Sequence, residues 1–139
     1  MKNVGILIIA MFSATIIGCD DGKVPLGGKV TYSDDGTPLE TGTVGFTTDD
    51  YNARGPIQKD GSFVVSSEKP GDGLPPGTYR VHISGAERQI GISPDGVAIM
   101  EPLIDRKFIS PHTSGLTLEV TPETKDYSIQ VDRYVPRKR

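Results

Sequence analysis

Thr78-Tyr79-Arg80-Val81-His82-Ile83-Ser84 alternates strictly between apolar and polar side chains, which is typical of a β-strand with one buried face. The same alternation recurs on both sides of this stretch. The residues predicted to face the core are, strand by strand, Val30 and Tyr32; Val44 and Phe46; Phe63 and Val65; Tyr79, Val81 and Ile83; Leu116, Leu118 and Val120; and Tyr127, Ile129 and Val131. Ile57 is predicted to mark one further short strand before Phe63. A chain of about seven short strands is typical of a sandwich or barrel.

The segments between these strands carry turn chemistry. Asp-Gly pairs stand at 35–36, 60–61, 72–73 and 95–96, and glycine tolerates the positive φ that tight turns require. Residues 70–77 hold three prolines and three glycines, so this stretch is predicted to be a loop. No segment after residue 19 shows a sustained helical period. The fold class predicted is therefore all-β, a Greek-key β-sandwich of about seven strands.

The N-terminus has the features of an export signal. Lys2 gives a short positive start, and residues 4–18 form an apolar to weakly polar run of fifteen residues. This run is shorter than the ~20 residues needed to span a bilayer as a helix, so it is predicted to be a cleaved signal peptide, residues 1–18. Removing it leaves the acidic chain, of net charge −3, one unit more negative.

Ile16-Ile17-Gly18-Cys19 resembles a bacterial lipobox, with Cys19 at the position that receives a lipid. The resemblance implies a diacylglyceryl group on the thiol, cleavage before Cys19 and acylation of the new amine. Each buried CH₂ contributes about 0.8 kcal/mol, and stable anchoring takes more than one acyl chain. Cys19 is the only cysteine of the chain. The alternative is an ordinary secretory signal that happens to be followed by a cysteine.

Several later motifs resemble the carboxypeptidase regulatory-like domains, in a version found in small bacterial lipoproteins. They stand in the expected order over residues 24–132: Gly28-Lys29-Val30, Thr37-Pro38-Leu39, Asp60-Gly61-Ser62-Phe63, Leu74-Pro75-Pro76-Gly77-Thr78-Tyr79 and Thr113-Ser114-Gly115-Leu116. The resemblance implies a transthyretin-like (prealbumin-like) seven-stranded sandwich without catalytic residues. Asp105 and Phe108 stand where that version usually has Pro and Tyr. The predicted organisation is a signal peptide at 1–18, a tether at 19–27, the sandwich at 28–133 and a basic tail at 134–139.

Residues with catalytic or metal-binding chemistry are sparse. His82 is predicted on the polar face of its strand as an exposed residue, and His112 in a loop; without thiolate partners the two do not form a structural zinc set. No serine stands in a G-x-S-x-G context. The acidic pairs lack the order of a calcium loop and are explained better as turn caps. We therefore predict no catalytic residues, no metal and no cofactor. The acidic balance gives no footprint for nucleic acid.

The predicted function is that of a non-catalytic, lipid-anchored protein of the bacterial cell envelope. It would be exported and held at the membrane through Cys19, with the sandwich acting as a structural or interaction module for a protein or glycan partner. Residues 86–112 lack clear alternation and form the longest predicted loop, in which residues 97–100 are expected to form either a short strand or a packed flap. The simpler alternative is a long crossover that only caps one end of the sandwich. The alternative is a module that binds carbohydrate or another small ligand through this loop and an exposed Tyr51. An enzyme is the third hypothesis and the least favoured.

Overall fold

The computed structural model describes residues 22–138. The predicted signal peptide and Cys19 lie outside the described residues. Over residues 22–138 the secondary structure is nine strands and one short 3-10 helix. Their bounds are β1 Gly27–Tyr32, β2 Thr43–Thr47, β3 Asn52–Pro56, β4 Ser62–Val64, β5 Gly77–Ser84, β6 Glu87–Ile92, β7 Ala98–Pro102, η1 Arg106–Ile109, β8 Leu116–Val120 and β9 Asp126–Val131.

Seven of these strands form two facing sheets, and the other two form a separate hairpin. One sheet has the order β4-β1-β9, and the other has the order β3-β2-β5-β8. β1 runs parallel to β9, and the remaining pairs are antiparallel. β2 pairs with β5 and β1 with β9, so the chain crosses between sheets and is not a simple meander. The predicted all-β, seven-stranded sandwich is confirmed.

The core lies between the two sheets, where the alternating side chains meet. Phe46 from β2 is fully buried, and its ring centroid lies 6.1 Å from that of Phe63 in β4 and 6.3 Å from that of Tyr127 in β9. Val81 and Ile83, from the stretch that opened the sequence argument, are likewise fully buried. The predicted inward residues are buried in this core, except for Leu116, Leu118 and Tyr127, which are partly buried and pack against it.

One predicted strand is displaced. Ile57 was expected to mark a strand, but β3 ends at Pro56 and consists of Asn52–Pro56. Its inward positions are Ala53 and Gly55, which carry no apolar alternation. They are small because the other sheet fills the space: a Cβ at Gly55 would lie 2.9 Å from Cδ2 of Phe63.

The start of the described chain is fastened to the sandwich within the range predicted as a tether. Val24 and Leu74 exchange two backbone hydrogen bonds, of 2.8 and 3.1 Å, and both side chains are buried. Lys23 donates to Asp72 at 2.9 Å and to Glu68 at 3.0 Å. The folded body therefore begins several residues earlier than the predicted boundary at residue 28.

The carboxylate of Asp72 organises the loop that receives this segment. It accepts backbone N–H donors from Ser67 at 2.7 Å and Lys69 at 3.0 Å, besides the Lys23 ammonium. These donors, the Ser67 N–H first among them, hold the pKa of Asp72 well below its usual range. The predicted loop is thus an ordered structure, held by the largely buried carboxylate of Asp72 and by the buried side chain of Leu74.

The segment predicted as a long loop, 86–112, contains regular structure. β6 and β7 pair as an antiparallel hairpin, and the short helix η1 follows. The predicted strand at 97–100 corresponds to β7, whereas β6 was not predicted. Among residues 22–138, no helix is both long and apolar enough to span a membrane.

Candidate interaction surface

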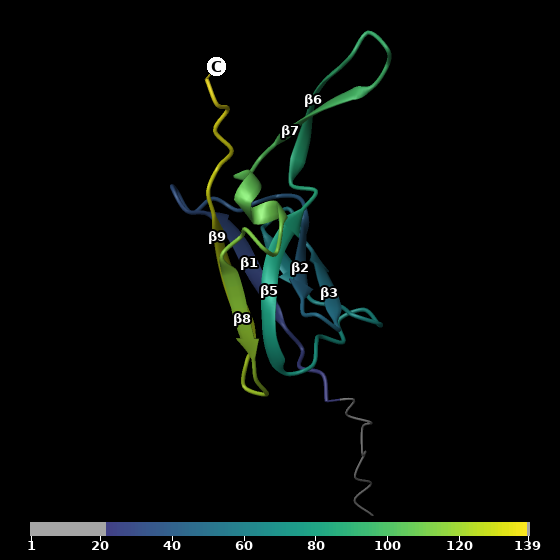
Figure 1. Cartoon of the computed structure of the whole chain (residues 1–139), viewed down its shortest axis with the longest axis vertical. Helices are drawn as coiled ribbons and strands as arrows, with labels where there is room; N and C mark the ends of the chain where they lie inside the picture. Colours follow the sequence, from purple (N-terminus) through teal and green to yellow (C-terminus); the bar gives the residue numbers. More distant parts are fainter. Residues whose placement is uncertain (1–21, 139) are drawn as a thin grey trace, which may run out of the picture.

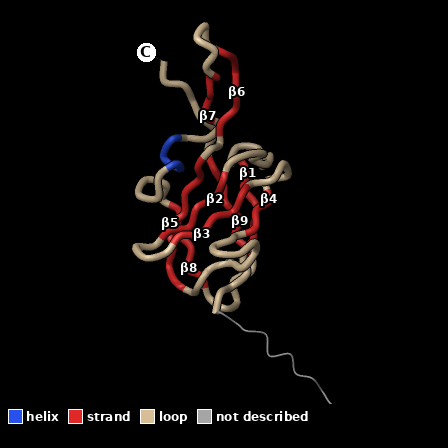
Figure 2. The backbone as a smooth tube through the Cα atoms, turned by 90° about the vertical axis from the view of Figure 1, so that its right-hand side faces the viewer, coloured by secondary structure: helices blue, strands red, loops and turns tan. Residues whose placement is uncertain are grey.

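The β6–β7 hairpin projects from one end of the sandwich. In Figure 1 it rises beyond the sheets at the top, while the described chain begins at the bottom. Figure 2, turned by 90°, shows the same arrangement, with the C-terminal segment extending beyond the sheets at the same end of the molecule as the hairpin. The two ends of the described part of the molecule are thus distinct: residue 22 lies near one end, and the hairpin lies at the other.

The hairpin exposes an unusual share of the large apolar side chains. Eight such residues are exposed in the described chain, and five of them are in or next to the two strands. Those five are Ile90, Ile92, Val97, Ile99 and Met100. Single exposed apolar residues are normal, whereas a concentration of this kind makes the hairpin a candidate interaction site. We call this set the apolar hairpin surface.

Both faces of the hairpin are apolar. Gly91 pairs with Ile99, and Ile92 pairs with Ala98, with a β-bulge between Gln89 and Gly91. Successive side chains of a strand point to opposite faces, so Ile99 lies on one face and Met100 on the other. Ile99 is 44% exposed and Met100 47% exposed. A flat surface could cover only one of these faces, whereas a groove would cover both.

Charged pairs fix the base of the hairpin. Arg88 and Glu101 face each other across the strands, with an Nε–Oε2 distance of 2.8 Å. Beside them, Arg133 stacks over the Tyr32 ring at 3.7 Å from its centroid and pairs with Asp34 at 2.8 Å. An apolar centre surrounded by polar and charged groups is the usual anatomy of a protein interface.

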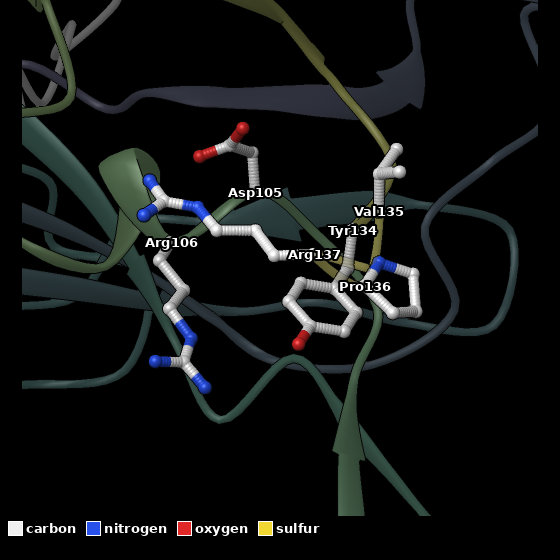
Figure 3. A pocket seen from close by; sticks show the side chains of 6 residues that line it. All are labelled: Asp105, Arg106, Tyr134, Val135, Pro136 and Arg137. Carbon is white, nitrogen blue, oxygen red and sulfur yellow. The ribbon is translucent and has the colours of Figure 1, made fainter. Parts of the chain in front are cut away.

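A shallow pocket of about 410 Å³ lies between η1 and the C-terminal segment. Figure 3 shows its lining, with the Tyr134 ring among the side chains of Arg106 and Arg137. The guanidinium of Arg106 lies 5.9 Å from the centroid of that ring. Backbone N–H of Tyr134 donates to Leu103 at 3.2 Å, which holds the segment against the end of β7. The pocket adds cationic groups to the base of the hairpin and brings no reactive constellation together.

The residues singled out from the sequence are scattered. His112 is exposed in the turn after η1, and its backbone N–H donates to Ser110 at 3.3 Å. Ser114 is buried, and its hydroxyl donates to the carbonyl of Val81. Asp35, from the acidic pair at 34–35, accepts a hydrogen bond from the backbone N–H two residues on, at 3.0 Å, as the turn-cap interpretation predicts. Asp60 accepts an equivalent bond of 3.0 Å from the backbone of Ser62. Within residues 22–138, no three His, Cys, Asp or Glu side chains are grouped as a metal would require.

Two expectations about single side chains are wrong. Tyr51 was expected to be exposed, but it packs against the core with its ring edge-on to Tyr79, 6.5 Å between centroids. His82 was expected to be exposed, but its ring lies over Gly45 and its Nδ1 is buried. Alternation predicted the correct face for His82. The ring is half-buried on that face because the residue opposite it on the neighbouring strand, Gly45, has no side chain.

Comparisons with known proteins find only distant similarity. No family model and no curated protein match the chain. A DUF3823 family protein from Bacteroides ovatus is 20% identical, with a TM-score of 0.43, over 81% of this chain and 45% of that one. A 9R-lipoxygenase from Cyanothece is 15% identical, with a TM-score of 0.42, over 88% of this chain and 19% of that one. The chain spans less than half the length of each, and neither likeness assigns it a family or an activity.

Proposed function

We propose that this protein is a non-catalytic interaction module of the bacterial cell envelope, with a lipid anchor at Cys19 and the apolar hairpin surface as its binding element. The observation that carries the proposal is the exposure of large apolar side chains on both faces of the hairpin. An isolated two-stranded hairpin is marginally stable in water, so its apolar residues are better explained by a partner than by the stability of the hairpin itself.

The proposed occupant is a protein with an apolar groove. The tip of the hairpin argues against a lipid surface, because Asp95 stands at the turn and would enter the membrane first. A charged carboxylate in hydrocarbon is costly. A second copy that packs hairpin against hairpin would cover only one face of each ribbon. A groove covers both faces, and its rim can contact the charged pairs at the base.

The carboxypeptidase regulatory-like identity stays part of this proposal. It rests on the order of the turn and strand motifs, and a β-sandwich of seven strands supports it. The lipid anchor rests on the lipobox pattern at Ile16–Cys19 and on the position of the described N-terminus, at the end of the molecule opposite the hairpin. An anchor at that end would leave the hairpin free to face away from the bilayer.

The anchor and the hairpin are tested separately. For the anchor, Cys19→Ser is expected to move the protein from the detergent phase to the aqueous phase, and intact mass of the wild type should show cleavage and acylation together. Unchanged partitioning of the variant, or a free thiol at Cys19, would contradict the anchor and leave the hairpin proposal standing.

For the hairpin, a photo-crosslinking amino acid is placed in the full chain at Ile92, at Ile99 or, as a control, at Val64. Val64 is 59% exposed on the body of the sandwich. The expected result is one identified protein captured from both hairpin positions and not from the control. Its purified form should bind the wild type and lose binding to Ile92→Asp and Ile99→Asp, but not to Val64→Asp. Capture of the chain itself or of lipid instead would refute the proposed partner.

A further inference from the structure

A second surface lies on the outer face of the four-stranded sheet, away from the hairpin. The register places Arg54 of β3 and His82 of β5 directly opposite Gly45 of β2, on either side of it. Thr43 lies one pair further along and faces Ser84. The side chains of these residues point outward, because Val44, Phe46 and Val81 occupy the inward positions. The outer face therefore carries a row of polar groups centred on a glycine.

Gly45 lets the His82 ring lie close against the sheet. A Cβ at this position would lie 2.5 Å from Nε2 and 2.9 Å from Nδ1 of His82, so the imidazole occupies the space that a side chain would take. The result is a hollow of about 540 Å³, lined by Thr43, Gly45, Asn52, Arg54, Pro56, His82 and Ser84. That volume is within the roughly 300–1,000 Å³ of small-molecule sites.

The lining offers unused hydrogen-bonding groups. Among the described residues, the Arg54 guanidinium has no ion pair or hydrogen bond. The Nδ1 of His82 has no partner either, but it is buried, so of these two groups Arg54 is the one exposed to a ligand. Burial, together with the nearby Arg54 charge, lowers the pKa of His82 and so favours the neutral ring. An anion bound in the hollow would offset the repulsion from Arg54 and favour the protonated ring.

We propose that this hollow binds a carboxylate-bearing sugar unit, such as a uronic acid residue of an acidic polysaccharide. Arg54 presents the planar fork that matches a carboxylate. Thr43, Ser84 and Asn52 supply groups that both donate and accept, as sugar hydroxyls require. The single permanent cation of the lining, Arg54, matches the single carboxylate of each uronic acid residue. An acidic peptide is a poorer fit, because Pro56 and Gly45 are the only lining residues without a polar side chain.

A neighbouring group extends the site along the sheet. Arg80 lies two residues from His82 on the same face, and it is paired with Thr47, which in turn faces Asn52. Arg54 and Arg80 therefore stand diagonally across the row. A chain of acidic sugars could place successive carboxylates near the two guanidinium groups.

The test titrates the full chain, purified in detergent, with tri-galacturonate, with a neutral galactose trimer and with sodium sulfate. Binding is read by calorimetry and by the NMR signal of the His82 imidazole. The expected result is saturable binding of the acidic trimer with a shift of the His82 signal, and neither effect from the neutral trimer. Equal binding of the neutral trimer, or an equal response to sulfate alone, would overturn the assignment to an acidic sugar.

Variants separate the site from general charge effects. Arg54→Gln is expected to weaken binding about tenfold or more, and Arg54→Lys to recover only part of it, because the bidentate contact is lost. Lys59→Gln removes a cation from the turn before β4, outside the hollow, and should leave binding unchanged. Comparable losses in Lys59→Gln and Arg54→Gln would refute a built site.

The pH dependence gives an independent readout. Arg54 faces His82 from the side of β3, β2 brings no charged group, and Arg80 is the nearest charge on β5 itself. Since folding leaves the pKa of His82 below its ordinary value, affinity for the acidic trimer should rise as pH falls from 8 toward that pKa. His82→Gln should remove the rise while keeping the fold. A rise that persists in this variant would contradict the role of His82.

Discussion

Gly73→Ala tests how the first described residues are fastened to the sandwich. Gly73 has a φ of +78°, and a Cβ there would overlap the backbone carbonyl oxygen of Val24. An alanine in this left-handed conformation costs roughly 1–2 kcal/mol. The overlap also forces Val24 away from Leu74, which breaks two backbone hydrogen bonds, at roughly 0.5–1.5 kcal/mol each. The expected loss in the free energy of unfolding is therefore about 2–5 kcal/mol.

Gly36→Ala is the matched control. Gly36 also follows an aspartate in a turn and has a φ of +72°, but a Cβ there would meet nothing within 4 Å. Only the conformational cost of roughly 1–2 kcal/mol is expected for this variant. Both free energies are measured by urea unfolding followed by far-ultraviolet circular dichroism. Equal losses in the two variants, or a smaller loss in Gly73→Ala, would refute the reasoning from the backbone overlap.

Three further predictions follow from burial and charge. Asp72→Asn should reduce the amount of stability that the protein loses in acid. The pKa of Asp72 is depressed in the folded state, so its carboxylate stabilises the fold above the unfolded pKa, and that stabilisation is lost as pH falls through the folded pKa. Urea unfolding of both proteins between pH 2 and 7 measures the difference. Phe46→Ala should cost about 3–5 kcal/mol and Val64→Ala less than about 1 kcal/mol, because Phe46 is fully buried and Val64 is 59% exposed; equal melting shifts would contradict the assigned core. Hydrogen exchange of the β6–β7 amides should be much faster than that of β5, and equal protection would show that the hairpin is part of the cooperative core.

The sandwich could be predicted from the sequence because apolar and polar residues alternate along strands that have one buried and one exposed face. Strands such as β5 have one face in the core and one in water, and their side chains follow that division. β3 was not predicted because its inward residues, Ala53 and Gly55, are too small to show the alternation, and at Gly55 the Phe63 ring of the other sheet leaves no room for a side chain. That constraint joins residues distant in the sequence, and no local pattern contains it.

The same reasoning explains what was missed at the two proposed sites. β6 has no buried face, as its residues are exposed except for the half-buried Gly91, so it carries no alternation to detect. The hollow beside His82 depends on which residue of β2 lies opposite, and the register between β2 and β5 is set by the whole sheet. Gly45 was visible as a glycine within a strand, a known sign of close approach, but its partner was not.

The hairpin and the outer hollow differ in the kind of binding that their side chains suit. A module that needed only stability would gain little from apolar residues on both faces of a projecting ribbon, since they lie outside the core that stabilises it. Their cost is solubility, which a partner would remove by covering them. The outer hollow carries no such cost, because its groups are polar and can bind water while empty. The partner proposed for the apolar hairpin surface is therefore expected to bind permanently, whereas the ligand proposed for the hollow is expected to bind reversibly.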